Sequence, residues 1–165
     1  MKAIVVYQSL WGNTAAIARA IAEGIGPEAR ALSTSEASAD AVKDADLVVA
    51  GSPVLGFSLP NEKMIESIRA NPGGAPKPPD LSQVPMRTWL GALASGSKKF
   101  AAFETRVKGP FGKATPAIEE SMKKLGYDPV AEAQHFIVDG KFGPLKAGEI
   151  ERARRWGMEL AKPRE

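Results

Sequence analysis

The stretch that decides the fold covers residues 3–14 and reads Ala3-Ile4-Val5-Val6-Tyr7-Gln8-Ser9-Leu10-Trp11-Gly12-Asn13-Thr14. Its first five residues are apolar and mostly β-branched, which is typical of a strand buried on both faces of a parallel sheet. A helix pattern begins at Thr14, carries Ile17 and Ile21 on one stripe, and ends at Gly26-Pro27. The stretch therefore predicts a strand, a glycine-containing loop and a helix in direct succession.

The same alternation continues along the chain. Further strands are expected at 29–32, 46–51, 99–103 and 134–138. Helices are expected near 38–43, after an N-cap at Asn61, around 88–93, over the run that ends at Gly126, and at 149–162. Five strands alternating with helices predict one domain, residues 1–165, built on a parallel sheet with helices on both faces. Ligands of such sheets bind beyond the carboxyl ends of the strands, which here means the loops 8–13, 52–60 and 104–112.

Composition excludes several classes of function. The chain has no cysteine, which excludes disulfides, thiolate chemistry and Cys-based metal sites, and its one histidine indicates no metal or catalytic centre. A net charge of +3 is too weak to indicate nucleic-acid binding. The longest apolar runs are too short to cross a bilayer, and no signal-peptide pattern opens the sequence, so we expect a cytoplasmic protein without a membrane partner.

The loop Ser9 to Thr14 has the residues of a phosphate site. A helix N-terminus offers free N–H groups and a partial positive charge, Gly12 allows close approach, and Ser9, Asn13 and Thr14 add side-chain donors. No lysine follows the glycine, so a nucleoside triphosphate with Mg²⁺ is not indicated. An isolated Gly-Asn-Thr would more often be a simple helix cap, but its position after the first strand favours an anion site.

This loop resembles that of the flavodoxin family, which has the form [ST]-x-x-G-x-T and binds the phosphate of flavin mononucleotide (FMN). The resemblance implies a flavodoxin-like three-layer α/β/α sandwich with five parallel strands in the order 2-1-3-4-5. It also implies that FMN contacts Ser9, Leu10, Trp11, Gly12, Asn13 and Thr14. Trp11 departs from the hydroxyl residue usual in flavodoxins and is more similar to the flavin-dependent quinone reductases.

Two further loops are expected to hold the flavin ring. Ser52, Pro53, Val54, Leu55, Gly56 and Phe57 resemble the family's G-[ST]-P loop, in which a peptide flip at Gly56 would respond to flavin reduction or Gly56 would only form a turn. In the loop after the fourth strand, Thr105, Arg106 and Gly109 would cover the other edge of the ring, and Arg106 would favour a negatively charged reduced flavin. The stacking Trp and Tyr common in the family are missing.

The remaining polar and aromatic residues are expected to be structural. His135 lies within a predicted strand, while Trp89 and Trp156 fit helical packing positions. Glu104 and Arg106 would either form an ion pair or, as alternating charges in a predicted loop usually do, lie exposed to solvent; we expect exposure.

Three functions stay open on the sequence. The first is an FMN-binding electron carrier that serves redox partner proteins or small-molecule acceptors as a monomer or weak homo-oligomer. The second is an FMN-dependent NAD(P)H:quinone-type oxidoreductase. The third is a flavin-free binding domain that keeps the scaffold.

Overall fold

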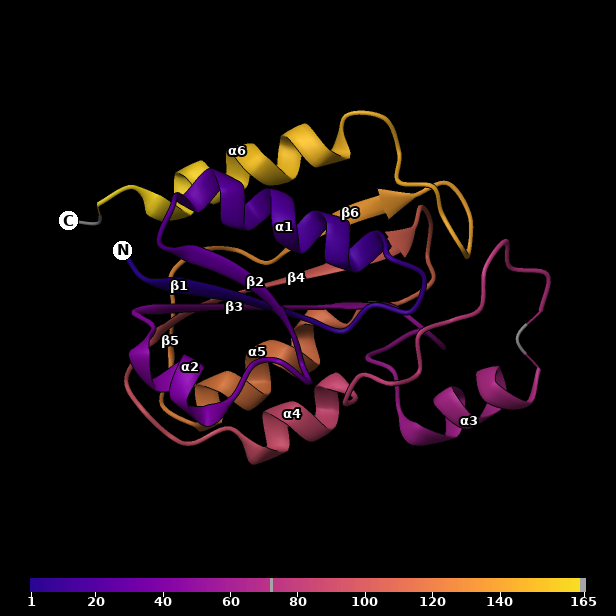
Figure 1. The fold of residues 1–165 in the computed structure, drawn as a ribbon, viewed down its shortest axis with the longest axis horizontal. Coiled ribbons are helices and arrows are strands. Elements are labelled where there is room, and N and C mark those ends of the chain that lie inside the picture. Colours follow the sequence, from indigo (N-terminus) through magenta and orange to yellow (C-terminus); the bar gives the residue numbers. More distant parts are fainter. Residues whose placement is uncertain (72, 164–165) are drawn as a thin grey trace.

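A parallel sheet forms the centre of the computed structural model, which describes residues 1–71 and 73–163. The strands follow the order β2-β1-β3-β4-β5, with β6 also paired to β4 (Figure 1). The predicted order 2-1-3-4-5 is confirmed. The bounds are β1 Ala3–Tyr7, β2 Ala29–Ser33, β3 Leu47–Pro53, β4 Lys99–Val107, β5 Asp128–Pro129 and β6 Gln134–Val138.

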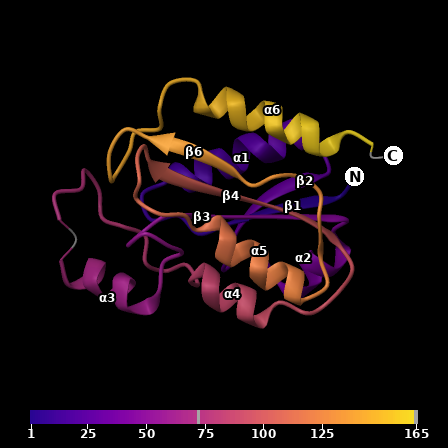
Figure 2. The same ribbon diagram turned by 180° about the vertical axis from the view of Figure 1, so that it is seen from behind.

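Helices cover both faces of this sheet, as the alternation predicts. Helices α1 and α6 lie on one face, and α2, α4 and α5 lie on the other (Figures 1 and 2). Helix α3 lies apart, beside the carboxyl ends of the strands. The bounds are α1 Asn13–Ile25, α2 Ala39–Asp44, α3 Glu62–Ala70, α4 Met86–Ala92, α5 Thr115–Lys124 and α6 Glu149–Ala161.

Each face of the sheet has its own apolar core because successive side chains of a strand point to opposite faces. In β1, Val5 packs into the core under α1 and α6, whereas Ile4 and Val6 pack into the core under α2, α4 and α5. The two tryptophans expected to pack do so. Trp89 is buried in α4 with its Nε1 donating to the Ala37 carbonyl at 3.0 Å, and the ring of Trp156 lies 6.3 Å from that of Phe136.

The fifth strand position is divided between two short strands. Phe100 of β4 pairs with Pro129 and Phe103 pairs with Gln134, so the partner chain advances five residues while β4 advances three. The extra residues leave the sheet between β5 and β6. The sequence predicts only the second of these strands, because β5 has just two residues and both are exposed.

Strand β4 is longer than the sequence predicts. Residues 104–107, expected in a loop, continue the strand, and Ser52 and Pro53 of β3 pair with Glu104 and Thr105. The expectation of solvent exposure at Glu104 is wrong, because its side chain is 1% exposed and lies against the start of α5. Helix starts are predicted better: Asn61 caps α3 by accepting from the Met64 N–H at 2.9 Å. Within residues 1–71 and 73–163, no helix is long and apolar enough to span a bilayer.

Candidate functional site

A pocket of about 490 Å³, its open mouth included, lies at the carboxyl ends of β1, β3, β4 and β6. The chain reverses its winding there, since β1 is flanked by β2 on one side and β3 on the other, which is where ligands of such sheets bind. All three loops singled out in the sequence contribute to its wall. The lining residues among those predicted are Ser9, Leu10, Trp11, Asn13, Thr14, Pro53, Val54, Leu55, Thr105 and Arg106.

The loop after β1 provides free backbone donors. The N–H groups of Leu10, Trp11, Asn13 and Thr14 have no hydrogen-bond acceptor within the described part of the chain. The loop is held in shape by the Gly12 N–H, which donates to Ser9 Oγ at 3.1 Å. Such a set of unpaired N–H groups at the start of a 13-residue helix is suited to an anion.

Two donors of this loop are already engaged. The Ser9 N–H donates to Gln83 Oε1 at 2.8 Å, and the Thr14 hydroxyl shares a 2.7 Å hydrogen bond with that of Thr105. The Thr14–Thr105 bond joins the first and third predicted loops directly. Because either hydroxyl can be the donor, one of the two protons is available to a further acceptor.

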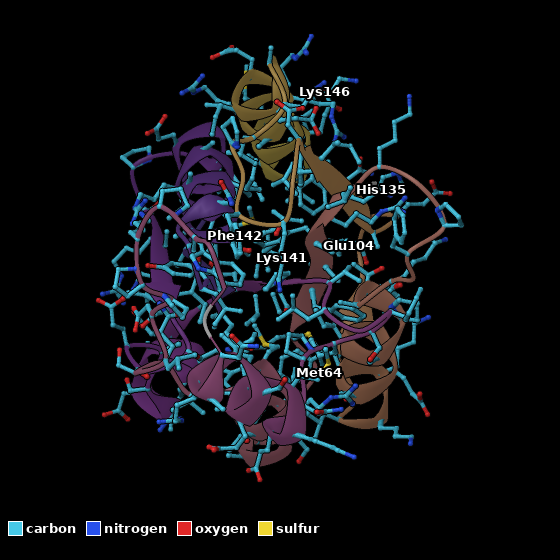
Figure 3. The ribbon with its side chains drawn as sticks, turned by 90° about the vertical axis from the view of Figure 1, so that its right-hand side faces the viewer. Met64, Glu104, His135, Lys141, Phe142 and Lys146 are labelled. Atoms are coloured by element: carbon cyan, nitrogen blue, oxygen red, sulfur yellow. The ribbon has the colours of Figure 1, made fainter. Side chains whose placement is uncertain are left out.

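Aromatic and basic side chains close the pocket from the side of β6. Phe142 packs its ring edge-on against Trp11 with centroids 4.8 Å apart, and the Asn13 side-chain amide donates to the Phe142 carbonyl at 3.2 Å. Lys141 lines the same pocket, and Figure 3 shows it beside Phe142. Trp11 Nε1 is buried without a hydrogen-bond partner among the described residues. A buried N–H without a partner is destabilising, so an acceptor supplied by water or by a ligand would stabilise it.

The loop after β3 forms an apolar wall and a tight turn. Pro53, Val54 and Leu55 line the pocket. The Leu55 and Ser58 backbones bond each other in both directions, at 3.0 and 3.2 Å, around Gly56 and Phe57.

Both central residues of this turn have positive φ, 56° at Gly56 and 69° at Phe57. A Cβ at Gly56 would also come within 2.3 Å of Met64 Cε, which would have to shift, so glycine suits this position through both its positive φ and its size. Gly56 thus makes a turn, and the structure does not place it in the pocket wall. Ser52 is buried at the end of β3, and Phe57 is 67% exposed outside the pocket.

Arg106 connects the pocket wall to a buried charge. Its Nε lies 3.2 Å from Glu104 Oε2, although the N–H does not point at that oxygen, and its Nη1 donates to the Gly109 carbonyl at 3.2 Å. The other oxygen of Glu104 accepts from the N–H groups of Ala114 and Thr115 at 2.8 and 2.9 Å. Gly109 itself lies in a neighbouring groove rather than in the pocket.

Several residues of the site escape the sequence reasoning. Val138 and Lys141 line the pocket, and both lie at the carboxyl end of β6, where the topological argument used for the other strands would have found them. Lys77 and Gln83 have no such signal. They belong to the Pro/Gly-rich connection 71–85, of which Pro72 lies outside the described residues. A side chain at Gly12 would meet the Lys77 ammonium at 3.4 Å.

Comparisons with known proteins bear on the fold. No protein-family model and no curated protein matches the sequence. A flavodoxin from the domain Archaea is similar over 98% of this chain and 96% of its own, with 23% identity and a TM-score of 0.67. Oxidised Flavodoxin 2 from Bacillus cereus is similar over 98% of both chains, with 18% identity and a TM-score of 0.66.

A third similar structure is a flavodoxin, WrbA-like protein from Agrobacterium tumefaciens, which covers 97% of this chain and 94% of its own at 22% identity with a TM-score of 0.62. At these low identities, the TM-scores and the nearly complete coverage establish a shared architecture. The resemblance first seen in residues 9–14 therefore extends to the architecture of the sheet and its helices, and the chain has the flavodoxin fold.

Proposed function

We propose that this protein binds FMN non-covalently and serves as an electron carrier. The observation that supports the proposal is the first loop, whose free N–H groups line the same pocket as the apolar wall formed by Pro53, Val54 and Leu55. A phosphate fits the donors and a flat aromatic ring fits the apolar wall. The ammonium of Lys77, which lies close to Gly12, adds a further donor for an anion.

Both parts of FMN are needed for tight binding. About four charge-assisted hydrogen bonds of ~1.5–3 kcal/mol each provide roughly 6–12 kcal/mol. Association costs about 4–15 kcal/mol, and nanomolar affinity needs a net of about −12 kcal/mol. The phosphate loop cannot supply this alone. The ring must therefore contribute through Pro53, Val54 and Leu55, with Arg106 on the opposite side.

The residues of the chain would orient the flavin and set its charge environment. FMN supplies the one- and two-electron chemistry when bound. The backbone N–H groups fix the phosphate, and the Thr14 hydroxyl adds a donor beside Thr105. Arg106 and Lys141 line the pocket, and although Glu104 offsets the charge of Arg106, Lys141 leaves a net positive charge at the wall, which favours a reduced flavin of negative charge. We therefore expect a less negative midpoint potential for the second electron than in a pocket lined by carboxylates.

The experiment is an FMN titration of the purified protein, followed by quenching of flavin fluorescence and by the absorption spectrum. Thr14→Val should weaken FMN binding by about tenfold, the equivalent of one lost charge-assisted hydrogen bond. Thr88→Val, an exposed change on α4, is the matched control and should bind FMN as the parent does. A protein that is still colourless after incubation with FMN and removal of the unbound flavin would refute the proposal and favour the flavin-free binding domain.

A second candidate is an FMN-dependent NAD(P)H:quinone-type oxidoreductase. Two observations support it: the aromatic residue at Trp11 and the cations Arg106 and Lys141, which would stabilise a flavin that takes up a hydride. Steady oxidation of NAD(P)H that depends on both FMN and an added quinone would favour this enzyme. Reduction of the flavin only by a protein or by dithionite would favour the carrier.

A further inference from the structure

A second hollow lies next to the flavin pocket, along strands β4 and β6 at the edge of the sheet. It is a groove of about 950 Å³, open to solvent, whose basic residues are Arg106, Lys108, His135, Lys146 and Arg152. These five residues are called the basic face below. Arg106 also lines the flavin pocket, so the two hollows share one side chain. Figure 3 shows His135 and Lys146 on the side of the molecule that also presents Lys141.

The register of β4 and β6 explains why the basic residues gather. Glu104 pairs with His135, and Arg106 pairs with Ile137. Because every second side chain of a strand points to the same face, these four side chains share one face of the sheet. Phe136, between the last two, points into the core on the opposite face. Lys146 and Arg152 then approach from beyond β6, the edge strand.

The charge of this region is not balanced locally. Both carboxylates near the groove are buried and already paired, Glu104 with Arg106 and Glu149 with Arg152 at 2.8 Å. The adjoining loops 108–114 and 139–148 contain four lysines and a single acidic residue, Asp139. A surplus of positive charge therefore faces solvent around the mouth of both hollows.

The backbone edge of β6 is closed, so the groove has to bind through side chains. Glu149 Oε2 accepts from the Ile137 N–H at 2.7 Å, and Arg152 donates to the His135 carbonyl. The Lys146 N–H donates to the Ile137 carbonyl at 2.9 Å. An added β-strand would find these positions occupied. The groove offers the exposed ammonium groups of Lys108 and Lys146 beside the two paired guanidinium groups, and these cations attract carboxylates.

Two exposed aromatic residues extend this surface. Phe111, 50% exposed, packs against Gly109 of the groove, and Phe57 is 67% exposed. The Phe57 carbonyl accepts from the Lys113 N–H at 3.2 Å, which ties the two loops together. Phe57 keeps a left-handed φ of 69°, a conformation that costs an ordinary residue about 1 kcal/mol or more. Exposed aromatic side chains next to charged ones are common at protein–protein interfaces.

We propose that the basic face, with Phe57 and Phe111 beside it, docks the acidic surface of a protein redox partner. The proposal rests on the proposed electron-carrier function, because Arg106 sets docked carboxylates next to the flavin pocket. A protein suits the groove better than a dinucleotide. The groove is open to solvent, and among the described residues its lining holds a single ring, the imidazole of His135, and no Phe, Tyr or Trp on which an adenine would stack.

The test measures binding by ¹H–¹⁵N NMR titration with two probes of similar size and opposite charge: an acidic [2Fe–2S] ferredoxin and the basic cytochrome c. Binding is measured on the full chain with and without FMN, so the result does not depend on the flavin. We expect the ferredoxin to shift the amide signals of residues 106–113 and 135–149 of this protein, and cytochrome c to leave these signals unchanged. Raising the ionic strength from about 0.01 to about 0.15 M should weaken ferredoxin binding by about tenfold.

Charge reversal identifies the surface. The double variant K108E/K146E should weaken ferredoxin binding by about tenfold or more. The matched control is K123E/K124E, two exposed charge reversals that change the net charge by the same amount near the C-terminal end of α5. It should leave the affinity within about twofold. Equal binding of the two probes, equal loss in the control, or displacement of the ferredoxin shifts by NADPH would overturn the proposal. Failure of FMN to bind, with ferredoxin binding intact, would overturn the flavin assignment alone.

Discussion

Replacing Glu104 by Gln tests whether the buried pair behind the pocket holds β4 and α5 together. The Glu104 carboxylate is 1% exposed and Arg106 is 16% exposed in its side chain, so both charges lie largely out of water. The carboxylate accepts two N–H groups at the start of α5 and lies 3.2 Å from the Arg106 Nε. The Gln variant keeps the shape and removes the charge.

The magnitude follows from these contacts. Two charge-assisted hydrogen bonds become neutral ones, a loss of about 1 kcal/mol each, and the favourable charge at the N-terminus of α5 is lost. Arg106 is also left without its counter-charge, and these losses together make up the about 3–5 kcal/mol that removal of one partner of a buried pair costs in total. We therefore expect Glu104→Gln to lower the free energy of unfolding by about 3–5 kcal/mol.

Urea unfolding at neutral pH, followed by circular dichroism, measures the effect. With a slope near 2 kcal/mol per molar urea, the midpoint should fall by about 1.5–2.5 M. Glu120→Gln removes an exposed carboxylate that pairs with Lys124 and should cost less than about 0.5 kcal/mol. The double variant E104Q/R106Q should cost less than the sum of its single changes. A loss under about 1 kcal/mol for Glu104→Gln, or strict additivity, would refute the reasoning.

Three further outcomes follow from the structure. The pKa of His135 is lowered below 6.5, first of all because burial disfavours the charged imidazole. The positive charges of Arg106, Arg152 and Lys113 lower this pKa further, whereas the negative charge of Glu104 raises it. NMR of the single imidazole measures the pKa directly. The Arg152 hydrogen bond and the Ile137 N–H hold the pKa of Glu149 below 4.5 despite its burial, so its stabilisation is complete above that pH and is lost as pH falls through the lowered value. The difference in urea midpoint between the parent and Glu149→Gln should therefore be large at about pH 7 and small at about pH 3. Gly112→Ala would bring a Cβ within 2.0 Å of the Phe57 carbonyl at a φ of 86°, and should destabilise the protein by about 1–3 kcal/mol.

Each of these has a matched control. An unshifted imidazole pKa in urea-unfolded protein confirms that the fold lowers the value at His135. Glu159→Gln, an exposed partner of Lys162, should show little change with pH. Gly91→Ala adds a methyl group in open space within α4, where it should be neutral or stabilising. A Gly112→Ala protein as stable as its parent would show that the loops move apart freely.

The sequence by itself determined the alternation of strands and helices and the end of the sheet at which a ligand would bind, while the strand order followed from the resemblance of residues 9–14 to the flavodoxin family. Short-range patterns carry this information: a buried run such as Ala3–Tyr7, a cap such as Asn61, and a glycine loop between a strand and a helix. Topology rules for parallel sheets then leave few arrangements open. The positions of Pro53, Thr105 and Arg106 near residues 9–14 follow from the same rules.

Only the tertiary structure decided what surrounds those residues. The burial of Glu104 depends on α5, which begins 11 residues later, and the cover over the first loop comes from Gln83 and Phe142, 74 and 129 residues away from their partners. Such contacts leave no periodic trace in the sequence. They arise because the sheet brings the ends of distant strands together, and the side chains that meet there are fixed by packing in three dimensions.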